Sequence, residues 1–167
     1  GTEAAEIRQA QLECLSTIPI SGMITTGDIG SRICVHPPYK KQIGNRLALW
    51  AFSKTYGIDG IPCCGPIVKS AISDGAKTII SFDHVENGMS SCSDHADPVE
   101  GFEIAGPDGI FYPAKAIYTD SRRKLIISAP EVQDPKEVRY CFHNYAPVNL
   151  FSVYGLPASP FRIKVDR

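Results

Sequence analysis

In two stretches of the chain, mainly apolar side chains recur at helical spacing, and both stretches lie before Gly57. The first follows Thr2, a residue type that caps helices, and predicts a helix that ends near Ser16. The second follows Pro37–Pro38 and ends at Gly57, because proline suits the first turn of a helix and glycine suits the position after its last turn. The predicted helix faces consist of Ala4, Ile7, Cys14 and Leu15 in the first stretch and Ile43, Leu47, Trp50, Ala51 and Lys54 in the second. We expect Trp50 to belong to the core.

The segment between these helices predicts a buried strand over Met23–Thr26. This strand runs directly into Gly27 and Asp28, so that a carboxylate follows the strand end. His36 comes directly before a proline, and proline disfavours the helical conformation in the residue that precedes it. We therefore expect His36 in an extended loop at the start of the second helix.

From Ile58 onward the helical period disappears, and short β-rich runs alternate with turn residues. Asp74–Gly75 suits a tight hairpin turn, and residues 85–97 form a longer Gly/Ser/Asp-rich loop. Strands are predicted at residues 67–72, 77–82, 101–105, 110–112, 114–118, 125–128, 138–142 and 161–165. This spacing predicts an antiparallel β-sandwich over residues 59–167, preceded by a helical segment over residues 1–58.

Composition narrows the classes of partner. The 167 residues include 17 basic and 18 acidic side chains, which are interspersed and give a net charge of -1. This balance argues against nucleic acid and anionic membranes as partners, and no apolar run is long enough to span a bilayer. Six cysteines permit disulfides, while free buried thiols stay an alternative.

Asp28 and His36 are the candidate catalytic residues. A carboxylate bonded to one imidazole nitrogen leaves the other nitrogen free to take a proton from a serine hydroxyl. The alternative is that His36 is a surface residue and Asp28 a turn residue. Elsewhere, His95 belongs either to a metal cluster or to a polar surface loop, and residues 143–145 either line a sugar site or pack against the helical segment.

Asp28–Gly30 and residues 35–48 (VHPPYKKQIGNRLA) resemble the last conserved block of the sialate O-acetylesterases, a branch of the SGNH (GDSL-type) hydrolases. Residues 101–105, 138–140, 149–150 and 155–161 resemble the C-terminal β-domain of that family. The resemblance extends over nearly the whole chain. It implies an α+β fold, in which residues 1–58 are the C-terminal strand and helices of an SGNH-type α/β hydrolase domain and residues 59–167 an accessory β-sandwich.

The resemblance also implies a function. The members of that family hydrolyse O-acetyl esters on sugars, especially sialic acids, through a serine nucleophile, an acyl-enzyme and a histidine base. His36 corresponds to that base, and no metal or organic cofactor is expected. The expected partners are an acetylated sugar and the missing N-terminal portion of the same protein. The usual location of that family's members and the cysteine count predict an extracytoplasmic location.

Two features depart from the family pattern. The sequence has no Gly-Asp-Ser nucleophile block and no GxSxG elbow, so the chain is expected to be an inactive C-terminal piece whose nucleophile lies elsewhere. Many SGNH enzymes have an orienting aspartate three residues before the histidine, whereas Ile33 stands there in this chain. Either Asp28 or a backbone carbonyl of Ile33–Cys34 is left to orient His36. The alternative function is a non-catalytic carbohydrate-binding or interaction module built on the β-sandwich.

Overall fold

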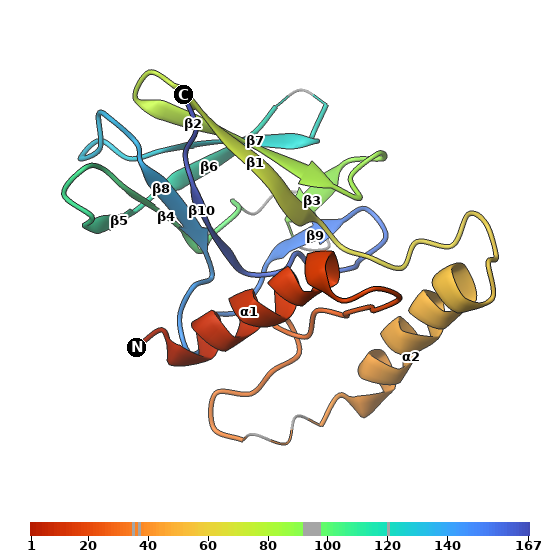
Figure 1. Ribbon diagram of the computed structural model, residues 1–167. Helices are drawn as coiled ribbons and strands as arrows, with labels where there is room; N and C mark the ends of the chain where they lie inside the picture. Colours follow the sequence, from red (N-terminus) through yellow and green to blue (C-terminus); the bar gives the residue numbers. More distant parts are fainter. Residues whose placement is uncertain (35, 37, 92–97, 120) are drawn as a thin grey trace.

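The computed structural model describes residues 1–34, 36, 38–91, 98–119 and 121–167 (Figure 1). Two α-helices precede a part that consists mainly of β-strands. The helices are α1 (Glu3–Thr17) and α2 (Lys40–Trp50), and α2 continues into the π-helical turn η1 (Ala51–Thr55). The strands are β1 (Ile67–Asp74), β2 (Lys77–Asp83), β3 (Met89–Ser91), β4 (Phe102–Ala105), β5 (Phe111–Pro113), β6 (Lys115–Tyr118), β7 (Lys124–Ser128), β8 (Glu137–Tyr140), β9 (Leu150–Ser152) and β10 (Phe161–Lys164).

Helix α1 confirms the first predicted helix, but only part of its predicted face packs. Leu15 of that face lies against the hydrophobic core. Glu3 lies in its first turn, where a carboxylate favours the positive end of the helix dipole. The helix ends where Ile18 turns extended, because Ile18 precedes a proline. Its buried residues are Ala5 and Leu12, two turns apart on one face, whereas Ile7 of the predicted face is exposed.

Helix α2 also forms at the predicted place, but its apolar residues are less buried than predicted. Arg46 is its buried residue, and Leu47 is 51% exposed. Trp50 is half-buried and lies against Gly22, where even an added Cβ would meet the indole Nε1 at 1.3 Å. The expectation that Trp50 belongs to the core is therefore wrong. In Figure 1 this helix stands away from the sheets, beside the loop that follows α1.

Residues 23–26 do not form the predicted strand. Within the described part of the chain they have no strand neighbour, and a strand needs one because its backbone N–H and C=O groups must be paired. Thr25 is instead held by side chains, since its hydroxyl lies 2.7 Å from the Ser159 hydroxyl and its carbonyl accepts a hydrogen bond from Arg46.

The described strands form three antiparallel sheets, with the orders β1-β2-β7-β6, β10-β8-β4-β5 and β3-β9. The β-rich character and the hairpin at Asp74–Gly75 are confirmed, and Gly75 has a φ of +61°, which suits glycine in such a turn. The β3-β9 pair falls partly in the predicted loop over residues 85–97 and was not predicted. The SGNH-type sheet and the sandwich arrangement stay predictions.

One hydrophobic cluster joins the two four-stranded sheets. The ring of Phe82 in β2 lies 6.0 Å from that of Phe161 in β10, which in turn lies 5.9 Å from Tyr140 in β8. Leu12 of α1 belongs to the same cluster. The helical segment is therefore attached to the β-rich part through shared core packing, while the domain boundary near residue 58 stays a prediction.

Candidate active site

Asp28 lies in the loop between α1 and α2, where it forms an ion pair with Arg46. The Arg46 guanidinium donates from Nη1 to Oδ1 of Asp28 at 2.8 Å and from Nη2 to Oδ2 at 2.5 Å. Both side chains are about nine-tenths buried, with exposures of 10% for Arg46 and 11% for Asp28. Nη1 also donates to the Thr25 carbonyl at 2.7 Å. This two-pronged contact fixes the start of the loop against α2.

His36 lies further along the same loop, four residues before α2 begins, and is exposed. Its backbone N–H and carbonyl both lie 3.4 Å from the Cys34 thiol sulfur. Within the described residues, its imidazole makes no hydrogen bond, and both oxygens of Asp28 are engaged by Arg46. The structure thus places both predicted residues on one loop without joining them in a hydrogen bond.

A cavity of about 300 Å³ opens beside this loop. One wall is the segment from Met23 to Gly27 together with Ser31 and Cys34, and the other walls come from α1 and from the turn after β8. Arg8 of α1 lines it, and burial lowers the pKa of this guanidinium below its usual value. The cavity therefore presents a cation and several hydroxyls next to the loop that carries His36.

Of the two interpretations of residues 143–145, a sugar site or packing against the helical segment, the contacts of Asn144 favour packing. Asn144 accepts a hydrogen bond from the Ala4 amide at 2.9 Å and donates one to Glu3 at 2.8 Å. It thereby fastens the first turn of α1, as the packing interpretation predicts. Tyr145 is 47% exposed and lines the cavity.

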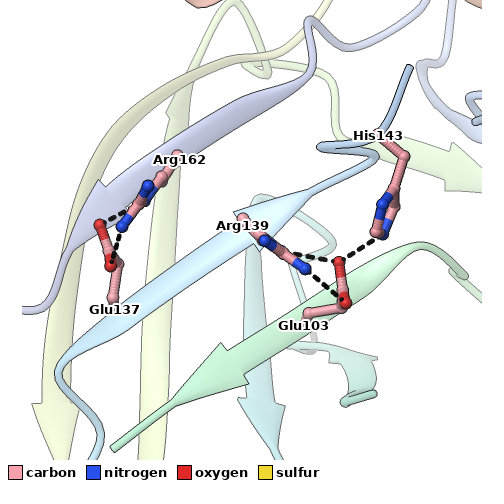
Figure 2. Close-up of polar contacts among 5 residues, drawn as sticks. All are labelled: Glu103, Glu137, Arg139, His143 and Arg162. Carbon is pink, nitrogen blue, oxygen red and sulfur yellow. Dashed lines mark hydrogen bonds and ion pairs between the residues drawn. The ribbon is translucent and has the colours of Figure 1, made fainter. Parts of the chain in front are cut away.

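A second polar cluster lies on the outer face of the sheet formed by β10, β8, β4 and β5 (Figure 2). Arg139 donates to both oxygens of Glu103, at 2.8 and 2.9 Å, and His143 Nε2 lies 2.8 Å from the same carboxylate. Arg162 and Glu137 form a parallel pair on the neighbouring strands. Strand register explains the central pair of the cluster, since Glu103 stands directly opposite Arg139.

We expect Glu103 to make the fold sensitive to acid. Burial alone would raise the pKa of Glu103, but the hydrogen bonds and charges of Arg139 and His143 outweigh it and hold the pKa below its ordinary value. This stabilisation is present above the ordinary glutamate range and is lost as the pH falls through the lowered pKa. Glu103→Gln should therefore lower the melting temperature at neutral pH, and the gap to wild type should narrow in acid. Exposed Glu131→Gln is the control, and a gap that stays constant with pH would contradict the assignment.

The described residues contain no group of three or more His, Cys, Asp or Glu side chains placed to hold a metal ion. The metal and surface-loop alternatives for His95 concern residues outside the described part. The five described cysteines, Cys14, Cys34, Cys63, Cys64 and Cys141, are free thiols. None of the helices in the described residues is both long and apolar enough to cross a bilayer.

Sequence reasoning missed Arg46 as the partner of Asp28. Its signal was its position three residues after Ile43 and four before Trp50, at the edge of the predicted face, where a buried cation requires a carboxylate.

This chain is similar to solved structures of known proteins. No family model and no curated protein matches the chain. The crystal structure of a carbohydrate acetylesterase from Xanthomonas citri matches 95% of the chain at 33% identity, with a TM-score of 0.87. This chain shares the fold of part of that acetylesterase. The match covers 36% of the acetylesterase chain, so most of that protein has no counterpart here.

Proposed function

We propose that this chain is the C-terminal part of a carbohydrate O-acetylesterase of the sialate O-acetylesterase type. The observation that carries the proposal is the match to the Xanthomonas citri acetylesterase over 95% of the chain. The resemblance of residues 35–48 to the sialate O-acetylesterases gives the proposal its finer form. The proposal includes an SGNH-type hydrolase segment followed by an accessory β-sandwich. It also includes an O-acetylated sialic acid or other glycan as substrate, and an extracytoplasmic location.

In the proposed mechanism, His36 acts as general base and acid. It takes the proton of a serine hydroxyl as that oxygen attacks the acetyl carbonyl, and it gives the proton to the departing sugar oxygen, which leaves as a hydroxyl. It then activates the water that releases acetate from the acyl-enzyme. The nucleophilic serine is supplied by the N-terminal portion of the same protein. An exposed imidazole without a hydrogen-bond partner among the described residues is free to meet such a serine.

The orienting group of His36 has two candidates, Asp28 and a backbone carbonyl of Ile33–Cys34. The Asp28 carboxylate is bound by Arg46 at 2.5 and 2.8 Å, which favours a role in holding the loop. A Ser–His pair oriented by the backbone accounts for the same chemistry.

The test measures acetate release by the complete protein and by this chain alone. The substrates are O-acetylated sialic acid and acetylated xylose. We expect the complete protein to release acetate and this chain alone to release none. If the complete protein is inactive while this chain binds the sugars, the function is that of a carbohydrate-binding module. Activity on acetylated xylose only would keep the esterase and remove the sialate preference.

A further inference from the structure

Cys63 and Cys64 lie next to each other on the connection between η1 and β1, and their sulfur atoms are 3.7 Å apart. Cys63 is buried and Cys64 is half-buried. Both line a cavity of about 310 Å³ whose other walls include Lys54, His84 and Tyr154. Both also line a smaller cavity that reaches Arg46. Two adjacent thiols are therefore oriented toward each other beside an open space.

The backbone next to the pair is tightly held. A Cβ added at Gly65 would lie 2.0 Å from the Pro157 carbonyl oxygen, so the chain passes the residue 156–159 segment with no spare room. The Pro66 carbonyl accepts a hydrogen bond from the Ser159 amide at 3.3 Å. The backbone that directly follows the two cysteines is thus held in place.

We propose that Cys63 and Cys64 form a redox modification site, which reacts with a small-molecule disulfide to give a bond between the two adjacent sulfur atoms. One cysteine sulfur loses its proton and attacks the small disulfide, which releases one thiol. The second cysteine sulfur then attacks the mixed disulfide, and the second small thiol leaves with its proton. The two cysteines are oxidised and the small disulfide is reduced to two thiols.

The bond formed in this way is strained. Cα atoms joined by a trans peptide are about 3.8 Å apart, whereas disulfides usually join Cα atoms about 4.4–6.8 Å apart. Strain makes a disulfide easier to reduce, so the site favours a reversible switch over a permanent crosslink. Burial, followed by the charge of a Cys63 thiolate, raises the pKa of Cys64 to about 12. Since the thiolate is the reacting form, closure should become faster as the pH rises.

The sequence offers a direct measurement, because trypsin cleaves after Lys54 and Lys69 and releases residues 55–69 with Cys63 and Cys64 as their only cysteines. The chain is treated with oxidised glutathione, and free thiols are alkylated after unfolding. After trypsin digestion, the mass of the peptide is measured by mass spectrometry. We expect an unalkylated peptide that is two hydrogen atoms lighter than its reduced form. Reduced glutathione should restore a doubly alkylated peptide.

The variants separate the proposal from chance oxidation. Cys64→Ser should abolish the lighter peptide, whereas Cys14→Ser, which removes an exposed thiol elsewhere, should leave it unchanged. A wild-type peptide that stays doubly alkylated, that keeps a glutathione adduct, or that is crosslinked to another cysteine would overturn the proposal. The measurement needs no esterase activity, so its outcome is independent of the proposed function.

Discussion

His36→Ala is expected to lower acetate release by the complete protein by about 10²- to 10⁴-fold, the usual contribution of a positioned acid–base group. The loss should appear in kcat, because in the proposed mechanism the imidazole moves protons in the transition state. His36 is exposed, so the melting temperature should not change. Added imidazole should restore part of the rate by filling the space that the substitution leaves.

The matched control is Arg32→Ala, which removes an exposed side chain from the same loop. It should leave kcat unchanged. If His36→Ala keeps the full rate in an active protein, the reaction uses another base, and the resemblance of residues 35–48 to the sialate O-acetylesterases has no catalytic meaning. A loss of both rate and melting temperature would instead point to a structural role.

Arg46→Ala should lower the free energy of unfolding by about 3 kcal/mol, since it leaves the Asp28 carboxylate buried without its counter-ion. The Thr25 carbonyl would lose its hydrogen bond as well. Arg46→Lys should recover only part of the stability, because the lysine ammonium lacks the planar fork of donors that matches the two carboxylate oxygens. Urea unfolding of this chain gives the measurement, with exposed Lys41→Ala as the control on the same helix. Equal stability of Arg46→Ala and wild type would show that the ion pair is not the anchor of the loop.

The same pair separates the two candidates for orienting His36. Asp28→Asn keeps the shape of the side chain but removes its charge, so it leaves the buried Arg46 guanidinium without a counter-ion and should also lower the melting temperature. If Asp28 only holds the loop, the complete protein should keep its rate at temperatures where Asp28→Asn stays folded. A loss of rate in the folded variant would make Asp28 part of the catalytic machinery.

The sequence predicted those parts of the fold that depend on local pattern. The hairpin at Asp74–Gly75 is confirmed because its turn residues and the flanking alternation agree. The β3-β9 pair was missed, since Met89–Ser91 is three residues long, carries two serines and shows no alternation. The apolar run at Met23–Thr26 reads as a strand, yet within the described residues it meets side chains and no neighbouring strand.

In the candidate site too, the sequence predicted what adjacent residues determine and missed what depends on a distant contact. The position of His36 in a loop before α2 is confirmed, because the proline rule acts between adjacent residues. The partner of Asp28 lies 18 residues away and depends on how the loop folds back onto α2, which no local pattern specifies. The catalytic roles of His36 and Asp28 stay predictions until the substitutions above are measured.

The burial of Leu12 among the core residues of the sheets has a consequence for how the protein can be divided. A shortened chain that began after residue 58 would lose Leu12, together with the Gln9 side chain that accepts the Arg162 amide of β10. Its sheets would then expose an apolar face and promote aggregation. A gene fusion that borrows the β-rich part should therefore carry α1 along with it.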